Sequence, residues 1–320
     1  MLLPIIALVI GLIVLIWSAD RFIDGASGVA GHFGMPPLLI GIIIVGFGTS
    51  APELVVSAFA AAQDNPGLAL GNAFGSNIAN IALILGVTTL IAPITVRSSI
   101  LKKELPILSF ATIVVGYLIW DLDISRNDGI IMLVVFAGIM AWTTREGMKG
   151  NSDILAQEFT EDLNSKKSSL GMSFFWLILG LVLLLASSRS MVWGSVEIAT
   201  QLGVSDLVIG LTIVAVGTSL PELASSIAAA RKGEHDIVIG NIIGSNMFNT
   251  LAVVGIAAVI RPFQTVSEVL TRDLPSVAIL TVALFFVCYR KGGEGRVTRI
   301  EGTLLVIAFA GYNSWVFLSQ

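Results

Sequence analysis

The chain has 320 residues, of which 55% are hydrophobic and only 12% are charged, and its mean hydropathy is +0.90. This composition excludes a water-soluble domain and predicts an all-α polytopic membrane protein embedded in a lipid bilayer. The net charge of −4 gives no reason to expect a nucleic-acid partner, and the single cysteine, Cys288, excludes an internal disulfide and a cysteine-rich metal site.

Apolar runs separated by polar breaks predict ten membrane spans. The first run lacks a basic leader and continues into polar residues, which favours a membrane helix over a cleaved signal peptide. The fourth and ninth runs are short for a hydrocarbon core about 30 Å thick. The predicted spans are 2–19, 36–62, 69–92, 105–120, 129–144, 172–188, 206–230, 238–260, 274–289 and 301–318.

One clearly polar segment, 145–170, separates the fifth span from the sixth. The predicted organisation is therefore a first five-helix half, 1–144, this linker, and a second five-helix half, 171–320. The acidic residues of the linker do not follow the spacing of an EF-hand loop, so we interpret the segment as a solvated connection.

The basic residues predict the orientation in the membrane. Fourteen of the eighteen Lys and Arg residues fall in the linker or in the alternate connections that share its side of the membrane. By the positive-inside rule that side is cytoplasmic, and both termini then face outward. The fourteen residues are Arg21, Arg97, Lys102, Lys103, Arg145, Lys149, Lys166, Lys167, Arg231, Lys232, Arg290, Lys291, Arg296 and Arg299.

Two near-identical motifs lie inside the second and seventh spans: Gly-Thr-Ser-Ala-Pro-Glu at 48–53 and Gly-Thr-Ser-Leu-Pro-Glu at 217–222. An acidic group at the bilayer centre costs roughly 2.5–3.5 kcal/mol on insertion scales, which favours a functional role. Each proline removes a backbone donor and frees a carbonyl one turn earlier. A simple kink with a protonated glutamate is the alternative for one motif, but paired breaks in two halves are typical of a transporter site.

The two motifs belong to a longer internal repeat. At an offset of 169 residues, positions 40–80 align without a gap on 209–249, and 19 of the 41 positions are identical. Five spans per half is an odd number, so the second half must enter the membrane from the opposite side as an inverted repeat. Such an axis brings Glu53 and Glu222 to similar depth, together with side chains of the third and eighth spans. These are Ser76, Asn80, Ser245 and Asn249.

The oxygen-rich character of these residues indicates the ligand. Carboxylates, hydroxyls, amides and carbonyls suit hard cations such as Ca²⁺ or Na⁺. Two ionised glutamates balance one Ca²⁺ or two Na⁺, or they can bind protons instead. Ions that compete for one pair of carboxylates give exchange, so an antiporter coupled to Na⁺ or to H⁺ fits these residues; a Ca²⁺-permeable channel and an intramembrane enzyme stay as alternatives. No His-Glu-x-x-His motif occurs, and neither histidine lies in an apolar run.

The paired motifs, each followed by Gly-Asn-x-x-Gly-Ser-Asn, resemble the α-repeats of the calcium/cation antiporter superfamily, and among its members the prokaryotic sodium/calcium exchangers. The resemblance implies a ten-helix antiporter of the bacterial inner membrane, without a resident cofactor, in which spans 1 and 6 slide as a gate. It also implies that Glu53 and Glu222 are shared Ca²⁺ and Na⁺ ligands. The further implied ligands are Thr49, Ser50, Thr218, Ser219, Ser76, Ser245, Asn80, Asn249 and the backbone carbonyls of Gly46 and Ala215.

One position departs from the pattern of the resemblance. In several exchangers an aspartate stands where this chain has Asn249, and in potassium-dependent relatives acidic residues there help to define the extra ion. Both halves here carry asparagine, Asn80 and Asn249. The stoichiometry, a role for K⁺ and the oligomeric state are therefore left open.

Overall fold

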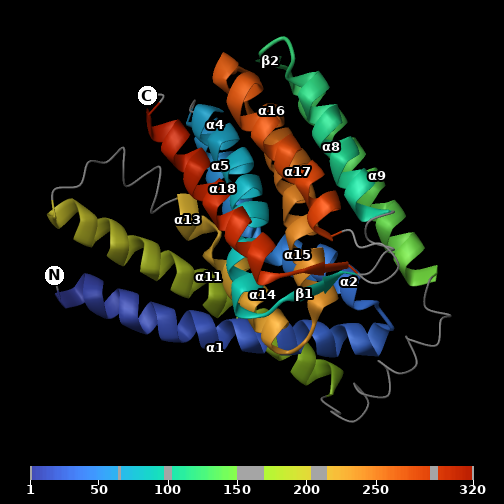
Figure 1. Cartoon of the computed structure of the whole chain (residues 1–320), viewed down its shortest axis with the longest axis vertical. Coiled ribbons are helices and arrows are strands. Elements are labelled where there is room, and N and C mark those ends of the chain that lie inside the picture. Colours follow the sequence, from blue (N-terminus) through green and yellow to red (C-terminus); the bar gives the residue numbers. More distant parts are fainter. Residues whose placement is uncertain are drawn as a thin grey trace.

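The computed structural model describes residues 2–63, 66–96, 103–149, 169–202, 215–288 and 295–318. Helices dominate this part of the chain, and they form an upright bundle with two long helices, α1 and α11, lying at an angle beside it (Figure 1). The helices of the first half are α1 (Leu2–Phe33), α2 (Pro37–Leu39), the π-helix η1 (Ile40–Val45), α3 (Gly46–Thr49), α4 (Ala51–Ala62), α5 (Pro66–Ile78), the π-helix η2 (Ala79–Ile84), α6 (Leu85–Ile91), α8 (Glu104–Leu118) and α9 (Arg126–Lys149).

The second half follows a similar order where it is described, with one additional π-helix, η6, before α17. Its helices are α11 (Leu170–Gln201), α13 (Ala215–Thr218), α14 (Leu220–Arg231), α15 (His235–Met247), the π-helix η5 (Phe248–Val253), α16 (Val254–Ile260), the π-helix η6 (Val269–Asp273), α17 (Leu274–Cys288) and α18 (Arg299–Leu318). Most of the predicted linker and the start of the predicted seventh span, 206–214, lie outside the described residues.

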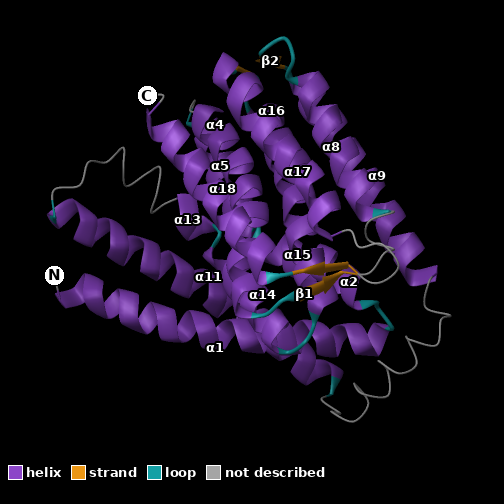
Figure 2. Ribbon diagram, in the orientation of Figure 1, coloured by secondary structure: helices purple, strands orange, loops and turns teal. Residues whose placement is uncertain are grey.

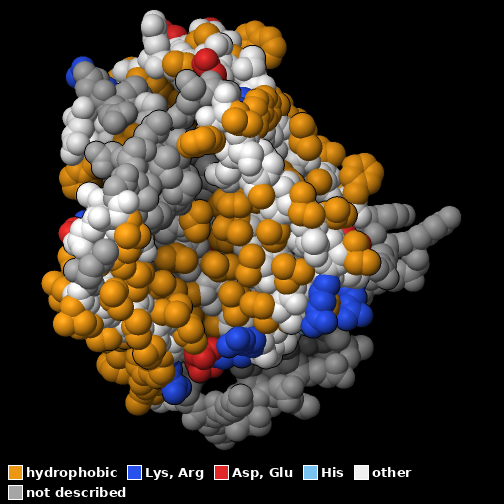
Figure 3. Space-filling model, turned by 60° about the vertical axis from the view of Figure 1, so that its left-hand side comes forward, with side chains coloured by type: hydrophobic (Ala, Val, Ile, Leu, Met, Phe, Trp, Pro, Cys, Tyr) orange, Lys and Arg blue, Asp and Glu red, His pale blue; other side chains and the backbone are white. Residues whose placement is uncertain are grey.

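Seven described helices or continuous helical runs are long and apolar enough to cross a membrane, and an eighth candidate is a bent pair, Pro37–Thr49 with Ala51–Ala62, whose parts meet at 44°. The shorter helix α8 is also apolar. Hydrophobic side chains cover the middle of the face seen in Figure 3, and charged side chains lie above and below them. This distribution is the one a multi-pass membrane protein requires.

Helices α1 and α11 form an antiparallel pair that is longer than predicted from the apolar runs. The predicted first span ends at residue 19, because Asp20, Arg21 and Asp24 interrupt the run, yet the helix continues to Phe33. The C-terminal part of α1 keeps one buried side, which includes Phe22 and Ala26. Packing of this side extends the helix in spite of the polar residues on the other side. In the same way α11 extends past the predicted end at 188 to Gln201.

Glycines let these two helices approach closely, and the contacts come in equivalent pairs. A Cβ on Gly11 would meet Met191, and a Cβ on Gly180 would meet the backbone of Phe22. Since 11 and 180, like 22 and 191, differ by 169, the two contacts correspond under the offset of the sequence repeat.

Short strands, which the all-α expectation did not include, join the two halves. Strand β1 (Ile94–Val96) pairs antiparallel with β4 (Gly295–Val297), and β2 (Asp123–Ile124) pairs antiparallel with β3 (Phe263–Gln264). The pairs lie at opposite ends of the bundle (Figure 2). They are also equivalent: Ile94 opposes Val297 and Phe263 opposes Ile124. Ile94 and Phe263 differ by 169, and Ile124 and Val297 differ by 173, so these are the same two positions of the repeat once a four-residue insertion in the second half is allowed for.

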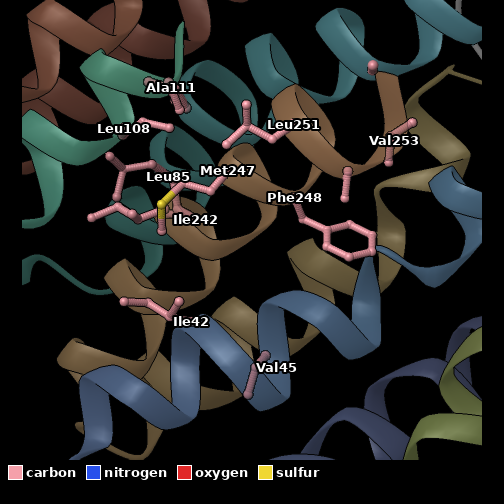
Figure 4. Close-up of a cluster of buried hydrophobic side chains, with 14 of the residues drawn as sticks. Ile42, Val45, Leu85, Leu108, Ala111, Ile242, Met247, Phe248, Leu251 and Val253 are labelled. Atoms are coloured by element: carbon pink, nitrogen blue, oxygen red, sulfur yellow. The ribbon is translucent and has the colours of Figure 1, made fainter. Parts of the chain in front are cut away.

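The core is built where the first half meets the second. Side chains of η1, α6, α8 and the α15–η5 helix gather in one apolar cluster (Figure 4). At the centre of this interface the backbones of α15 and η1 nearly touch, because a Cβ on Gly240 would lie 2.5 Å from the Leu38 carbonyl oxygen and 2.8 Å from the Gly41 Cα. Glycine is therefore required at this crossing.

Candidate functional site

The two predicted motifs form two matching helix breaks. Ser50 separates α3 from α4 with φ −83° and ψ 7°, and Ser219 separates α13 from α14 with φ −90° and ψ 7°. A proline follows in the first turn of each new helix, a position at which proline is favoured. The glutamate then stands in that same first turn, where the helix dipole favours negative charge.

Both glutamates are buried in the protein interior. Glu53 is 0% exposed and Glu222 is 1% exposed. The Ser50 hydroxyl donates a 3.0 Å hydrogen bond to Glu222 Oε1, so the break of the first motif contacts the carboxylate of the second. Among the described residues, both oxygens of Glu53 and Oε2 of Glu222 have no hydrogen-bond partner. Buried carboxylates of this kind require protonation, pairing or a bound cation.

Two asparagines that sequence reasoning did not select as site residues hold the breaks in place. The Asn72 amide donates to the Glu53 carbonyl at 3.0 Å, and the Asn241 amide donates to the Glu222 carbonyl at 3.3 Å. Asn241 also reaches the other motif, because its Oδ1 accepts a 3.4 Å bond from the Thr49 hydroxyl. The signal that could have found them is their identity at equivalent places of the repeat.

The predicted residues of the third and eighth spans line the same region. Ser76 and Ser245 are buried on α5 and α15, and the Ser245 hydroxyl donates to the Gly46 carbonyl at 3.3 Å. Asn80 and Asn249 are each the second residue of a π-helix, η2 and η5, and these π-helices correspond under the 169-residue offset. Single π-helical turns inside α-helices occur often at functional sites.

Asn80 and Asn249 have buried side-chain atoms without a hydrogen-bond partner among the described residues. Asn80 donates a 3.4 Å bond to Asn246 Oδ1, while Asn80 Oδ1 and both side-chain polar atoms of Asn249 are buried without a partner among the described residues. Asn77 and Asn246 bond between helices: Asn77 donates to Thr250 at 2.7 Å, and Asn246 Oδ1 accepts the bond from Asn80.

The second motif contributes the remaining predicted residues. Ser219 is 2% exposed, and its hydroxyl has no partner within the described part of the chain. Thr218 is half-buried next to it. Ala215 is the first described residue of α13, so the backbone that precedes it lies outside the described residues.

The two buried carboxylates have no basic side chain beside them in the described part of the chain. No Lys, Arg or His occurs among the buried side chains of the described ranges. Nor do those ranges contain a cluster of three or more His, Cys, Asp and Glu side chains. Two carboxylates surrounded by hydroxyl, amide and carbonyl oxygens are a ligand set for a hard cation rather than for zinc or copper.

Comparison with known proteins agrees with this geometry. The family model described as "Sodium/calcium exchanger protein" matches residues 3–145 and 172–318. The protein CaxA of Alkalimonas amylolytica is 44% identical over 323 residues, covering 100% of both chains. The inner membrane protein YrbG of Escherichia coli K12 is 38% identical over 312 residues, covering 96% of each chain. A solved structure of the sodium-calcium exchanger NCX_Mj superposes with a TM-score of 0.82 and 30% identity, covering 96% of each chain.

The fold and these comparisons together define a multi-pass membrane protein in the class of secondary cation antiporters. The chain belongs to the sodium/calcium exchanger family.

Proposed function

We propose that this protein exchanges Na⁺ for Ca²⁺ across a bacterial inner membrane, at a site built around Glu53 and Glu222. The observation that carries the proposal is the pair of buried carboxylates with unused oxygens and no basic side chain among the described buried residues. Transported cations supply the missing positive charge. One Ca²⁺ or two Na⁺ neutralise the pair, and the empty, doubly negative site is costly to move through a low dielectric. Exchange follows from this difference.

The surrounding oxygens complete the proposed ligand shell. Ca²⁺ takes six to eight oxygen ligands. The two glutamates supply carboxylate oxygens, and the rest come from hydroxyls, amides and carbonyls of both halves. These are Thr49, Ser50, Ser76, Asn80, Thr218, Ser219, Ser245 and Asn249, with the backbone carbonyls of Gly46 and Ala215 for Na⁺.

The proposal includes ten spans arranged as two inverted repeats, with both termini outside and the linker in the cytoplasm. The equivalent contacts support it, since the β1–β4 and β2–β3 pairs exchange the halves and lie at opposite ends of the bundle. The glutamate-bearing helices α4 and α14 likewise lie toward opposite ends of the bundle (Figure 1). An inverted repeat produces such contacts from its pseudo-two-fold axis.

Alternating access requires an element that covers the site and can move. Helices α1 and α11 cover both breaks: a Cβ on Gly48 would meet Phe22 of α1 and Leu181 of α11, and a Cβ on Gly217 would meet Val192 of α11. These two helices lie at an angle to the bundle and pack closely on each other. We therefore assign the pair as the gate.

The test is uptake of ⁴⁵Ca²⁺ into proteoliposomes loaded with Na⁺, K⁺ or acidic buffer, with and without each outward gradient. Na⁺-driven uptake that is lost in Glu53→Gln supports Na⁺/Ca²⁺ exchange at this site. Uptake driven only by a proton or K⁺ gradient keeps the site and establishes the alternative, an H⁺- or K⁺-coupled cation exchanger. Uptake that is indifferent to every counter-ion contradicts the antiporter.

A further inference from the structure

The carbonyl that Pro221 leaves without a helical donor has a partner on another helix. In an α-helix the N–H of residue 221 would bond to the carbonyl of Gly217, and proline has no N–H. The Ser188 hydroxyl of α11 donates a 2.9 Å hydrogen bond to this Gly217 oxygen. Ser188 is 4% exposed, so the bond is shielded from water.

The contact lies where α11 packs closely against the second motif. A Cβ on Gly217 would be only 2.2 Å from Val192 Cγ2, which places the backbone of the break directly against α11. Two residues further on, the Ser219 hydroxyl is buried without a partner among the described residues. The bond from Ser188 thus reaches the backbone of the proposed ion-binding segment from a helix that contributes no proposed ligand.

We propose that Ser188 is a positioning residue that couples the location of α11 to the shape of the second ion-binding break. The inference rests on the proposed exchange and adds a residue to it. When α11 moves along the bundle, its hydroxyl leaves the Gly217 carbonyl, and the carbonyl then needs water or a cation as its partner. The bond therefore stabilises the arrangement of α11 seen in this structure over the alternative arrangement.

The position equivalent to Ser188 in the first half cannot make this hydrogen bond. The residue equivalent to Ser188 at the 169-residue offset is Ala19, whereas its neighbour Ser187 is equivalent to Ser18. Ser18 and Ser187 both donate to carbonyls of their own helices, Leu15 and Leu184. At the position equivalent to Ser188 the first half therefore has no hydroxyl that could bond to its own break, so the two access states are not equally supported.

The experiment compares Ser188→Ala with Ser187→Ala, a matched control on the adjacent buried residue. The apparent KM for Ca²⁺ is measured on each face of the membrane, in right-side-out and in inverted vesicles, and the ratio of the two values reports the balance of access states. Removal of one neutral hydrogen bond is expected to change this ratio about five-fold in Ser188→Ala. Ser187→Ala should leave the ratio within about two-fold of wild type. Ser188→Thr keeps the hydroxyl and should also give a ratio close to that of wild type.

A ratio in Ser188→Ala that equals that of Ser187→Ala overturns the proposal. Backbone hydrogen exchange of residues 216–223 in the purified protein gives a second readout, with faster exchange expected in Ser188→Ala only. If the wild-type protein moves no Ca²⁺, the exchange function fails by itself, and equal hydrogen-exchange rates in the two variants then overturn the role of Ser188.

Discussion

The Ser50 hydroxyl at the break of the first motif donates a 3.0 Å hydrogen bond to the carboxylate of Glu222 in the second motif. The two residues are 172 positions apart in the sequence, and both are at most 1% exposed. This bond joins the two halves of the chain at the proposed cation site, so a change at either residue should affect ions bound by both motifs.

Replacement of Ser50 by alanine should weaken Ca²⁺ binding. Hydrogen bonds to charged groups contribute about 1.5–3 kcal/mol, so the apparent KM for Ca²⁺ should rise roughly ten-fold or more. The measurement is gradient-driven ⁴⁵Ca²⁺ uptake over a range of Ca²⁺ concentrations. Ser18→Ala is the control, because Ser18 is equally buried but bonds within its own helix. An unchanged KM in Ser50→Ala would show that the bond plays no part in binding.

Asn241→Ala should impair transport, although the side-chain hydrogen bonds of Asn241 go to backbone and hydroxyl groups rather than to a carboxylate. The side chain donates to the Glu222 carbonyl and to Ser226 Oγ at 2.9 Å, and it accepts from Thr49. Its loss leaves several buried groups unpaired, which costs about 1–3 kcal/mol for each group, so transport should fall to about a tenth or less. Asn313→Ala is the control, since among the described residues the Asn313 amide donates to a carbonyl of its own helix. Equal transport rates in the two variants would contradict the positioning role of Asn241.

Gly240→Ala should destabilise the protein by overpacking. The added Cβ would lie 2.5 Å from a backbone oxygen of α2, and backbone cannot rotate away as a flexible side chain can. Such strain typically costs about 1–3 kcal/mol or more, so the melting temperature in detergent should fall. Gly311→Ala on α18 meets nothing within 4 Å and should leave the melting temperature near that of wild type. A melting temperature of Gly240→Ala equal to that of Gly311→Ala would show that the helices can separate without cost.

The predicted orientation can be tested with reporters fused after the last residue, Gln320. Because most basic residues share one side of the membrane, the C-terminus should face outward. Alkaline phosphatase at this position should then be active, while green fluorescent protein should be dark. A fluorescent fusion without phosphatase activity would reverse the topology.

The residues of the candidate site that can be predicted from the sequence are those that recur in both copies of the repeat. The offset of 169 residues singles out both glutamates, and their cost in an apolar span indicates function. Asn72 and Asn241 show the same repeat, but an asparagine inside a span is as consistent with helix packing as with a site. Only the distances reveal that their amides hold the backbone of the two glutamates.

The fold departs from prediction where packing acts against local pattern. Asp20 and Arg21 end the first apolar run, yet α1 continues through them because Phe22 and Ala26 remain buried. The strands β2 and β3 have two residues each, which is too short for an alternating pattern to be recognised. Their pairing depends on the two halves meeting in space, and no local signal encodes that.

The most direct test of the account is equilibrium binding of ⁴⁵Ca²⁺ to the purified protein in the presence of increasing Na⁺. If Glu53 and Glu222 form one shared site, one Ca²⁺ should bind per chain, Na⁺ should displace it, and Glu53→Gln and Glu222→Gln should each abolish the binding. Binding that persists in the Glu53→Gln/Glu222→Gln double variant, or that Na⁺ does not displace, would contradict the central claim.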